Sequence, residues 1–330
     1  MLQLHNSTKF AAGMALFPNA EAIDTLYVMV KASFNFAPQF TLADEQTPPM
    51  EQDVYWTEPG KSSLKYASDM HTGKPATDIV MLGHACAPEK KEATQLDISL
   101  TVGKVHKTLR VYGDRQWRDD RITNPTPFRT MPIVYEKAFG GVHIANGEIV
   151  ADEPRNPIGR GFAGQRNANE MNGVPLPNLE DPAHLIRSPD DQPAPACFAC
   201  CPGHWLPRAN YAGTYDDKWK KTRAPYLPTD FDSRFHNMAH PELIYPGYLQ
   251  GGEMVEITHM HPDGPFKFEL PELKLTARVE IGQRVEEPPF NLETLILEPN
   301  QRKLSMVWRA ALSCDKQMWK VSEIRVGMTR

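Results

Sequence analysis

Residues 96–112 read "LDISLTVGKVHKTLRVY", two runs in which apolar and polar side chains alternate on either side of Gly103-Lys104. Alternation with a period of two is typical of a β-strand that has one face in a core, and a two-residue turn between two such runs predicts a β-hairpin. The residues expected on its buried face are Ile98, Leu100, Val102, Val105, Leu109 and Val111. This hairpin points to antiparallel β-structure.

Similar runs occur toward both ends of the chain. Residues 25–36, "TLYVMVKASFNF", alternate in the same way and predict a half-buried strand with Lys31 on its outer face. Further β-type runs, separated by Pro, Gly and Asn, cover 254–260, 266–270, 273–281, 294–299 and 303–312. Short strands at this spacing predict a mainly β protein with antiparallel sheets arranged as a sandwich or in a barrel-like form.

The middle of the chain has a different composition. Of the 30 prolines, 14 fall in residues 154–246, where they disfavour helix interiors and central strands. The same stretch contains many aromatic rings, so we expect it to pack and not to be a disordered linker. We predict a long, irregular, proline-rich segment lying over or between the sheets, with little helix apart from one short helix near 216–221.

These patterns divide the chain into three parts. We expect an N-terminal antiparallel β region over 1–120, a proline- and aromatic-rich irregular segment over 121–246, and a C-terminal antiparallel β region over 247–330. The two β regions are expected to form one structural unit.

Composition limits the kinds of partner. The chain has 330 residues, 41% of them hydrophobic and 23% charged, with a formal net charge of −5, as in a globular protein. It lacks a long basic run, so nucleic acid is not an expected partner. No apolar stretch reaches the roughly 18–20 residues that cross a bilayer, so no membrane span is expected. Residues 10–17, "FAAGMALF", could be the core of a short signal peptide, but we expect a first β-strand there.

Cysteine usage suggests a reducing compartment. Five cysteines are scattered over a large chain, which favours free thiols in a cytoplasmic protein. Cys197, Cys200, Cys201 and His204 lie close together, but a tetrahedral zinc site usually needs two well-spaced ligand pairs, and only one is present. We expect buried structural thiols and no metal or cofactor.

The window 213–235, "GTYDDKWKKTRAPYLPTDFDSRF", is rich in aromatic rings and carboxylates. Two of Asp216, Asp217, Asp230 and Asp232 could form an acid/base pair of a glycosidase-like hydrolase. Their spacing singles out no pair, and capping of turns beside prolines is a simpler explanation. Likewise, "NPIGRGFAG" (156–164) lacks the order of a phosphate-binding loop and is expected to form turns, with Arg155 and Arg160 pairing with carboxylates.

Seven segments, taken in order, resemble one protein family. They are "SSLKYASDMHTGKPATDIVMLGHACAP" (62–88), "MPIVYEKAFGG" (131–141), "NPIGRGF" (156–162), "PLPNLE" (175–180), "HWLPRANYAGTYDDKW" (204–219), "LPTDFDSRFHNMAHP" (227–241) and "LQGGE" (249–253). Together they are similar to the family called domain of unknown function 2169, over roughly residues 1–300. Its members are bacterial proteins commonly encoded beside type VI secretion effector genes. The resemblance implies a cytoplasmic adaptor or chaperone that holds a toxic effector and helps load it onto the VgrG spike, and it does not imply an enzyme.

The resemblance also carries over individual residues. Those expected to bind the partner are Trp205, Arg208, Tyr215, Asp216, Trp219, Asp230 and Phe231. Those expected to be structural are Tyr135, Phe139, Asn156, Gly159 and Gly161. The cysteines of "ACFACCP" do not belong to the family pattern. Trp, Tyr and Arg dominate interface hot spots, so the first set suits recognition of a polypeptide. The rings of Trp205, Trp219 and Phe231 are nevertheless expected to be mainly core, and direct contact of some of them with the partner is the alternative. A structural component of the secretion apparatus is a third possibility.

Overall fold

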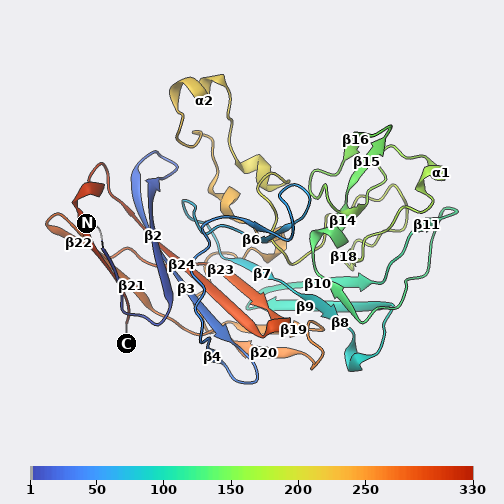
Figure 1. Cartoon of the computed structure of the whole chain (residues 1–330), viewed down its shortest axis with the longest axis horizontal. Helices are drawn as coiled ribbons and strands as arrows, with labels where there is room; N and C mark the ends of the chain where they lie inside the picture. The colour runs from blue at the N-terminus through green and yellow to red at the C-terminus, as the bar shows by residue number, and fades with distance from the viewer. Residues whose placement is uncertain (1–2, 330) are drawn as a thin grey trace.

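The computed structural model describes residues 3–329 and consists mainly of β-strands joined by long irregular connections (Figure 1). The prediction of a mainly β protein with antiparallel sheets and little helix is confirmed. Three sheets contain the longer strands.

The central sheet has the strand order β2 (Ala11–Pro18), β3 (Asp24–Asn35), β24 (Lys303–Ser313), β23 (Asn291–Glu298) and β7 (Asp78–Met81), with the short β4 (Thr41–Leu42) also paired to β3. All neighbours in it are antiparallel except β23 and β7. Residues 11–18 therefore form a strand, as expected.

A second sheet has the order β18 (Leu179–Glu180), β10 (Val105–Tyr112), β9 (Gln95–Val102), β19 (Met254–Thr258) and β20 (Phe266–Glu269). The predicted hairpin is confirmed: β9 and β10 are antiparallel, and Ile98 lies opposite Leu109 while Val102 lies opposite Val105. A third sheet has the order β1 (Gln3–Asn6), β25 (Val321–Met328), β21 (Leu275–Ile281) and β22 (Arg284–Glu286).

The remaining elements are short. The strands are β5 (Val54–Tyr55), β6 (Leu64–Tyr66), β8 (His84–Cys86), β11 (Trp117–Arg118), β12 (Arg121–Ile122), β13 (Thr130–Pro132), β14 (Phe139–Gly140), β15 (Val142–Ala145), β16 (Glu148–Asp152) and β17 (Arg160–Gly161). The α-helices are α1 (Ala168–Met171) and α2 (Asp217–Thr222), and the second matches the helix predicted near 216–221.

Each main sheet combines strands from the two ends of the sequence. β1 pairs with β25, β3 with β24, and β9 with β19. Neither end of the chain can complete these sheets without the other, because every one of the three ladders crosses from the first 120 residues to the last 84.

The strand predicted at 25–36 is not half-buried, which corrects the sequence interpretation. Both faces of β3 are covered, and even Lys31 is only 3% exposed. The second face is covered by the connection that follows the strand: a Cβ on Gly13, which lies opposite Met29, would be 3.6 Å from Pro49 Cγ, and Asp69 lies near Lys31. Burial lowers the pKa of Lys31, while the nearby Asp69 opposes that shift. The alternating pattern therefore predicted the strand correctly but did not predict that its second face is covered.

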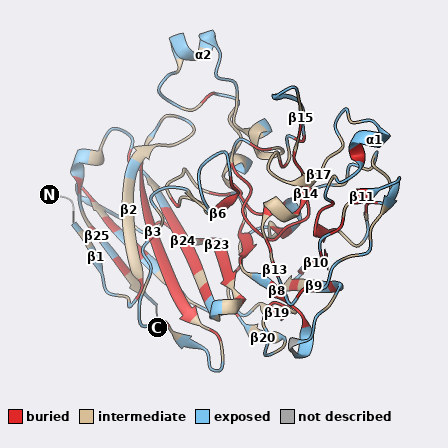
Figure 2. Ribbon diagram, turned by 45° about the vertical axis from the view of Figure 1, so that its right-hand side comes forward, coloured by how far each residue is buried: buried red, intermediate tan, exposed pale blue. Residues whose placement is uncertain are grey.

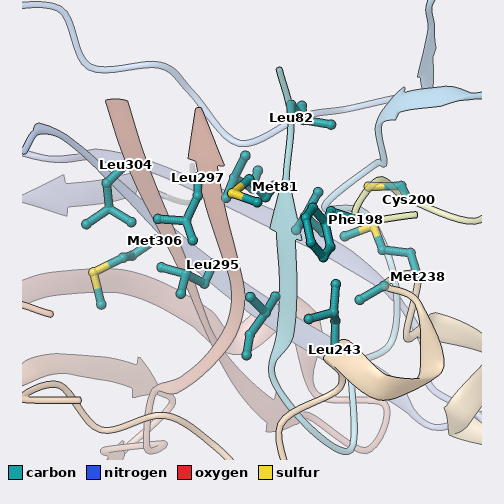
Figure 3. Close-up of a cluster of buried hydrophobic side chains, with 14 of the residues drawn as sticks. Met81, Leu82, Phe198, Cys200, Met238, Leu243, Leu295, Leu297, Leu304 and Met306 are labelled. Atoms are coloured by element: carbon teal, nitrogen blue, oxygen red, sulfur yellow. The ribbon is translucent and has the colours of Figure 1, made fainter. Parts of the chain in front are cut away.

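The core extends from the central sheet into the proline-rich segment. Figure 3 shows Met81 of β7 and Leu295 and Leu297 of β23 on the same cluster as Phe198 and Met238. The backbone N–H of Met81 also donates to the carbonyl of Phe198 at 3.0 Å. In Figure 2 the central strands β3, β24 and β23 are largely buried, whereas α2 is exposed. The segment therefore packs against the central sheet. None of the described helices is long and apolar enough to cross a membrane.

Candidate functional site: a projecting arm and the groove at its base

Residues 213–230, the first part of the aromatic-rich stretch 213–235, project from the molecule. We call this segment the arm. Figures 1 and 2 show α2 at its end, projecting outside the three sheets. No residue of α2 is buried, although Trp219 is partly covered. A segment with so little burial gains little stability from the core, so it must be ordered by its own contacts.

Those contacts run along the whole arm. Asp216 caps α2, accepting a 2.7 Å bond from the backbone N–H of Trp219. The Trp219 indole N–H donates to the carbonyl of Tyr226 at 2.8 Å, and the Tyr215 ring meets the Trp219 ring edge-on with 4.7 Å between centroids. At the base, Asp230 accepts bonds from the N–H and hydroxyl of Thr214, at 3.0 and 2.7 Å. The arm is therefore preorganised and yet exposed.

The arm also encloses a polar hollow of about 430 Å³. Its lining residues are Thr214, Asp216, Lys218, Trp219, Thr222, Arg223, Pro228, Thr229 and Asp230. At the far side, Arg223 links the arm to the turn between β2 and β3 by donating to the carbonyl of Ala20.

Three of the predicted binding residues lie at the base of the arm instead of on it. Trp205 is 2% exposed and packs edge-on against the Tyr135 ring, 5.5 Å between centroids, so it is a core residue. Arg208 is partly buried and donates to the carbonyls of Phe235, at 3.0 Å, and Cys201. Phe231 is partly buried against the Phe235 ring, 5.8 Å away. The others, Tyr215, Asp216, Trp219 and Asp230, are on the arm.

An apolar groove lies next to this base. It consists of two adjoining hollows of about 270 and 310 Å³, and Cys201, Pro207 and Pro241 line both. Arg208 and Arg234 line the hollow nearer the arm. The groove is thus walled by the proline-rich segment, whose ring-restricted backbone holds its shape.

The five predicted structural residues meet at one place. Asn156 is fully buried, and its side-chain amide donates to the carbonyls of Tyr135 at 2.8 Å and Phe139 at 2.9 Å. β14 and β17 pair beside it, with Phe139 opposite Arg160 and Gly140 opposite Gly161. The segments 131–141 and 156–162 are therefore joined through one amide.

The two glycines there are required for different reasons. A Cβ on Gly159 would lie 2.4 Å from the Asn156 amide nitrogen and 2.7 Å from the carbonyl oxygen of Ala138, so the backbone approach needs glycine. Gly161 has φ +93°, and a Cβ on it would meet Pro177 Cδ at 2.7 Å. Arg155 pairs with Glu153 at 2.6 Å and Arg160 lies 3.8 Å from Asp114, as the sequence suggested.

Residues 21–309 match a family model described as an uncharacterized protein conserved in bacteria, DUF2169. The chain belongs to this family. No curated protein and no solved structure matches it. The match includes the arm, the groove and the glycine-containing segments, which are therefore part of the DUF2169 region of the chain.

The carboxylates of this DUF2169 member act as local caps. Asp230 is bonded by Thr214, and Asp232 accepts from the guanidinium of Arg234 at 2.6 Å. These bonds lower the pKa of both carboxyls. A general acid needs a raised pKa, so neither environment favours that role.

The cysteines of the "ACFACCP" segment are buried thiols. Burial raises the pKa of Cys197 to about 12 and that of Cys201 to about 11, and it raises the pKa of Cys200 further. The Cys201 sulfur lies 2.7 Å from the Tyr135 hydroxyl. Among residues 3–329, no three His, Cys, Asp or Glu side chains are arranged to hold a metal ion.

One feature beneath the arm's attachment was missed by sequence reasoning: a buried layer of charges. Lys74 and Asp78 form an ion pair of 2.8 Å with both side chains fully buried, and Asp78 also accepts from the Asn237 amide at 2.9 Å. Beside it, Arg309 donates to Glu293 at 2.8 Å. Partners 159 positions apart, as Asp78 and Asn237 are, leave no local sequence signal. The layer fixes 237–238 against β7 and so positions the wall of the groove.

Proposed function

We propose that this protein is an adaptor or chaperone of type VI secretion, which binds a toxic effector in the bacterial cytoplasm and helps load it onto the VgrG spike by non-covalent recognition. Membership of the DUF2169 family supports this proposal through the genomic setting of that family. The observation that carries it is the arm, an ordered projection that the fold itself does not use for packing.

The chemistry of the arm suits recognition of a polypeptide. Tyr215 is 53% exposed and its ring packs edge-on against the Trp219 ring. Tyr226 is 41% exposed, its backbone carbonyl accepts from the Trp219 indole, and its ring centroid lies 5.8 Å from the Arg223 guanidinium carbon. Rigid, half-exposed rings lose little conformational entropy when they are covered, so they bind more strongly per unit area than flexible side chains. The apolar groove at the base offers a second contact for an extended segment of the same partner.

The mechanism follows from this arrangement. The effector covers the exposed rings and the groove. The part of the effector in contact with them is shielded until the spike presents a competing surface. Release requires no covalent step, because the contacts are hydrogen bonds and apolar burial.

The test is co-expression with the product of the neighbouring gene and with the spike protein. Affinity purification of this chain is expected to retain the effector, and Tyr215→Ala and Tyr226→Ala are each expected to weaken binding about 30-fold, as hot-spot truncations do. The matched control is Trp319→Ala. Trp319 is also an exposed ring, at 80%, but it lies between β24 and β25 in the sequence and belongs neither to the arm nor to the lining of the groove.

Two results would count against the proposal. Purified protein that binds neither effector nor spike would overturn it. Recovery of this chain in the secreted, assembled particle would favour a structural component of the apparatus instead.

A further inference from the structure

The central sheet ends in an open edge at β2. This strand has one neighbour, β3, along all eight of its residues, from Ala11 opposite Lys31 to Pro18 opposite Asp24. Within residues 3–329, no hydrogen bond from outside the β2–β3 ladder reaches the backbone of 11–18. Alternate N–H and C=O groups therefore face outward without a protein partner.

The composition of this edge is unusual for an unprotected strand. β2 reads "AAGMALFP", with no charged residue and no proline before its last position. Leu16 is 40% exposed. Natural edge strands are normally blunted by charges, by proline, by shortness or by covering segments, because an open ladder recruits other strands.

The other edges of the two larger sheets carry such protection. The opposite edge of the central sheet, β7, is covered by backbone contacts from Phe198 and Ile244. β20 carries Lys267 and Glu269, while β18 and β22 are two and three residues long. Among the edges of the two larger sheets, β2 alone in the described chain is long, uncharged and uncovered.

We propose that the β2 edge binds an extended, uncharged apolar strand of the protein partner, which extends the central sheet by one strand. This inference rests on the proposed function, since it assigns to the same partner a contact in addition to the arm and the groove. Backbone bonds would supply affinity, and the exposed Leu16 side chain would select apolar residues.

The position of the edge favours a foreign strand over a second copy of this chain. An eight-residue strand is about 26 Å long, so edge-to-edge pairing of two β2 strands buries on the order of 500 Å² in total. Stable dimers need about 1,200–2,000 Å². β2 ends two residues before Ala20, to which Arg223 of the arm is bonded, so a partner strand leaving the edge meets the arm directly.

The experiment uses amide hydrogen exchange on the full-length chain, alone and with the effector encoded by the neighbouring gene. Alternate amides in 11–18 are expected to exchange rapidly in the free chain and to become at least 10-fold slower in the complex. Ala15→Lys and Leu16→Lys place a cation on either face of the edge and are expected to weaken effector binding at least 10-fold. Val285→Lys is the control, because Val285 is a 46% exposed apolar residue on the edge strand β22.

Each outcome decides the matter. Effector binding with unchanged exchange in 11–18 and full affinity of both lysine variants overturns the edge inference and leaves the proposed function intact. A dimer of the free chain that both lysine variants dissociate assigns the edge to a second copy and overturns the inference. Absence of any effector binding to the folded chain overturns the proposed function together with this inference. Circular dichroism and thermal melting of the variants identify any that fail to fold, and exchange in the unmodified chain then decides alone.

Discussion

Arg223 donates a 2.7 Å hydrogen bond from Nη2 to the carbonyl oxygen of Ala20, although the two residues are 203 positions apart. Its Nε donates at 2.9 Å to the carbonyl of Leu227, within the arm. One guanidinium therefore joins the arm internally and ties it to the turn that follows β2. This relationship makes the arm and the edge of the central sheet neighbours.

Replacing Arg223 is expected to free the arm without unfolding the protein. Arg223→Gln removes both bonds, and the two carbonyls can be solvated, so the free energy of unfolding is expected to change by less than about 1 kcal/mol. Amide exchange in 214–230 is expected to accelerate severalfold. Lys220→Gln, an exposed position on α2, is the control. Unchanged exchange in the arm of Arg223→Gln would show that the tie is not needed.

Asn156→Ala is expected to lower the free energy of unfolding by about 3 kcal/mol, because the buried carbonyl of Phe139 loses its amide donor, that of Tyr135 keeps only the Ala138 N–H, and a cavity is left. Chemical denaturation measures this directly. Asn210→Ala, at an exposed position, is expected to cost less than about 0.5 kcal/mol. Equal costs for the two variants would contradict the joining role of the Asn156 amide.

Gly161→Ala tests close packing separately from backbone strain. Gly161 and Gly173 have similar positive φ angles, +93° and +86°, but only Gly161 would place its Cβ within 4 Å of another group. Gly173→Ala is expected to cost about 1 kcal/mol from the left-handed backbone alone. Gly161→Ala is expected to cost at least about 1 kcal/mol more, because Pro177 must move. Denaturation midpoints of the pair provide the comparison.

Stability is expected to fall as the solution is acidified below about pH 6.5. Burial lowers the pKa of His236 to about 3 and that of His240 to about 4, and burial lowers the pKa of His71 well below its usual range. The unfolded chain therefore binds protons between pH 6.5 and these values while the folded chain does not, so their stabilisation is complete above pH 6.5 and declines below it. Each histidine contributes a slope of about 1.4 kcal/mol per pH unit at most.

The measurement for this prediction is the free energy of unfolding at several pH values between 7.5 and 5. His236→Gln is expected to give a shallower dependence than the parent chain, whatever its absolute stability. His106→Gln, at an exposed position, is the control and is expected to keep the parent slope. An identical slope for His236→Gln would contradict the claim that His236 contributes to the pH dependence of stability.

The thiols are expected to be unreactive in the folded protein. All five cysteines are buried, and burial raises the pKa of each thiol. A thiol reagent at pH 8 is therefore expected to label them only at the rate of unfolding. Denaturant should release all five at once. Rapid labelling of one cysteine in the native state would show an opening of the proline-rich layer.

Local patterns in the sequence determined the strands and the short helix. The hairpin at 96–112 was predictable because alternation and a glycine turn act between residues a few positions apart, and α2 was predictable because Asp216 caps its own helix. The two segments that meet at Asn156 were also recognisable by their glycines and rings, although not that one amide joins them.

Tertiary structure alone decided burial and exposure. Trp205 and Tyr215 come from the same aromatic-rich region, yet one is core and the other lies on the arm, because only Trp205 faces Tyr135 from a segment 70 positions earlier. Lys31 was expected at the surface and is buried, because the connection that follows β3 brings Pro49 and Asp69 over that face of the sheet. Strand and helix tendencies depend on near neighbours in the chain, whereas burial depends on which distant segments come to cover them.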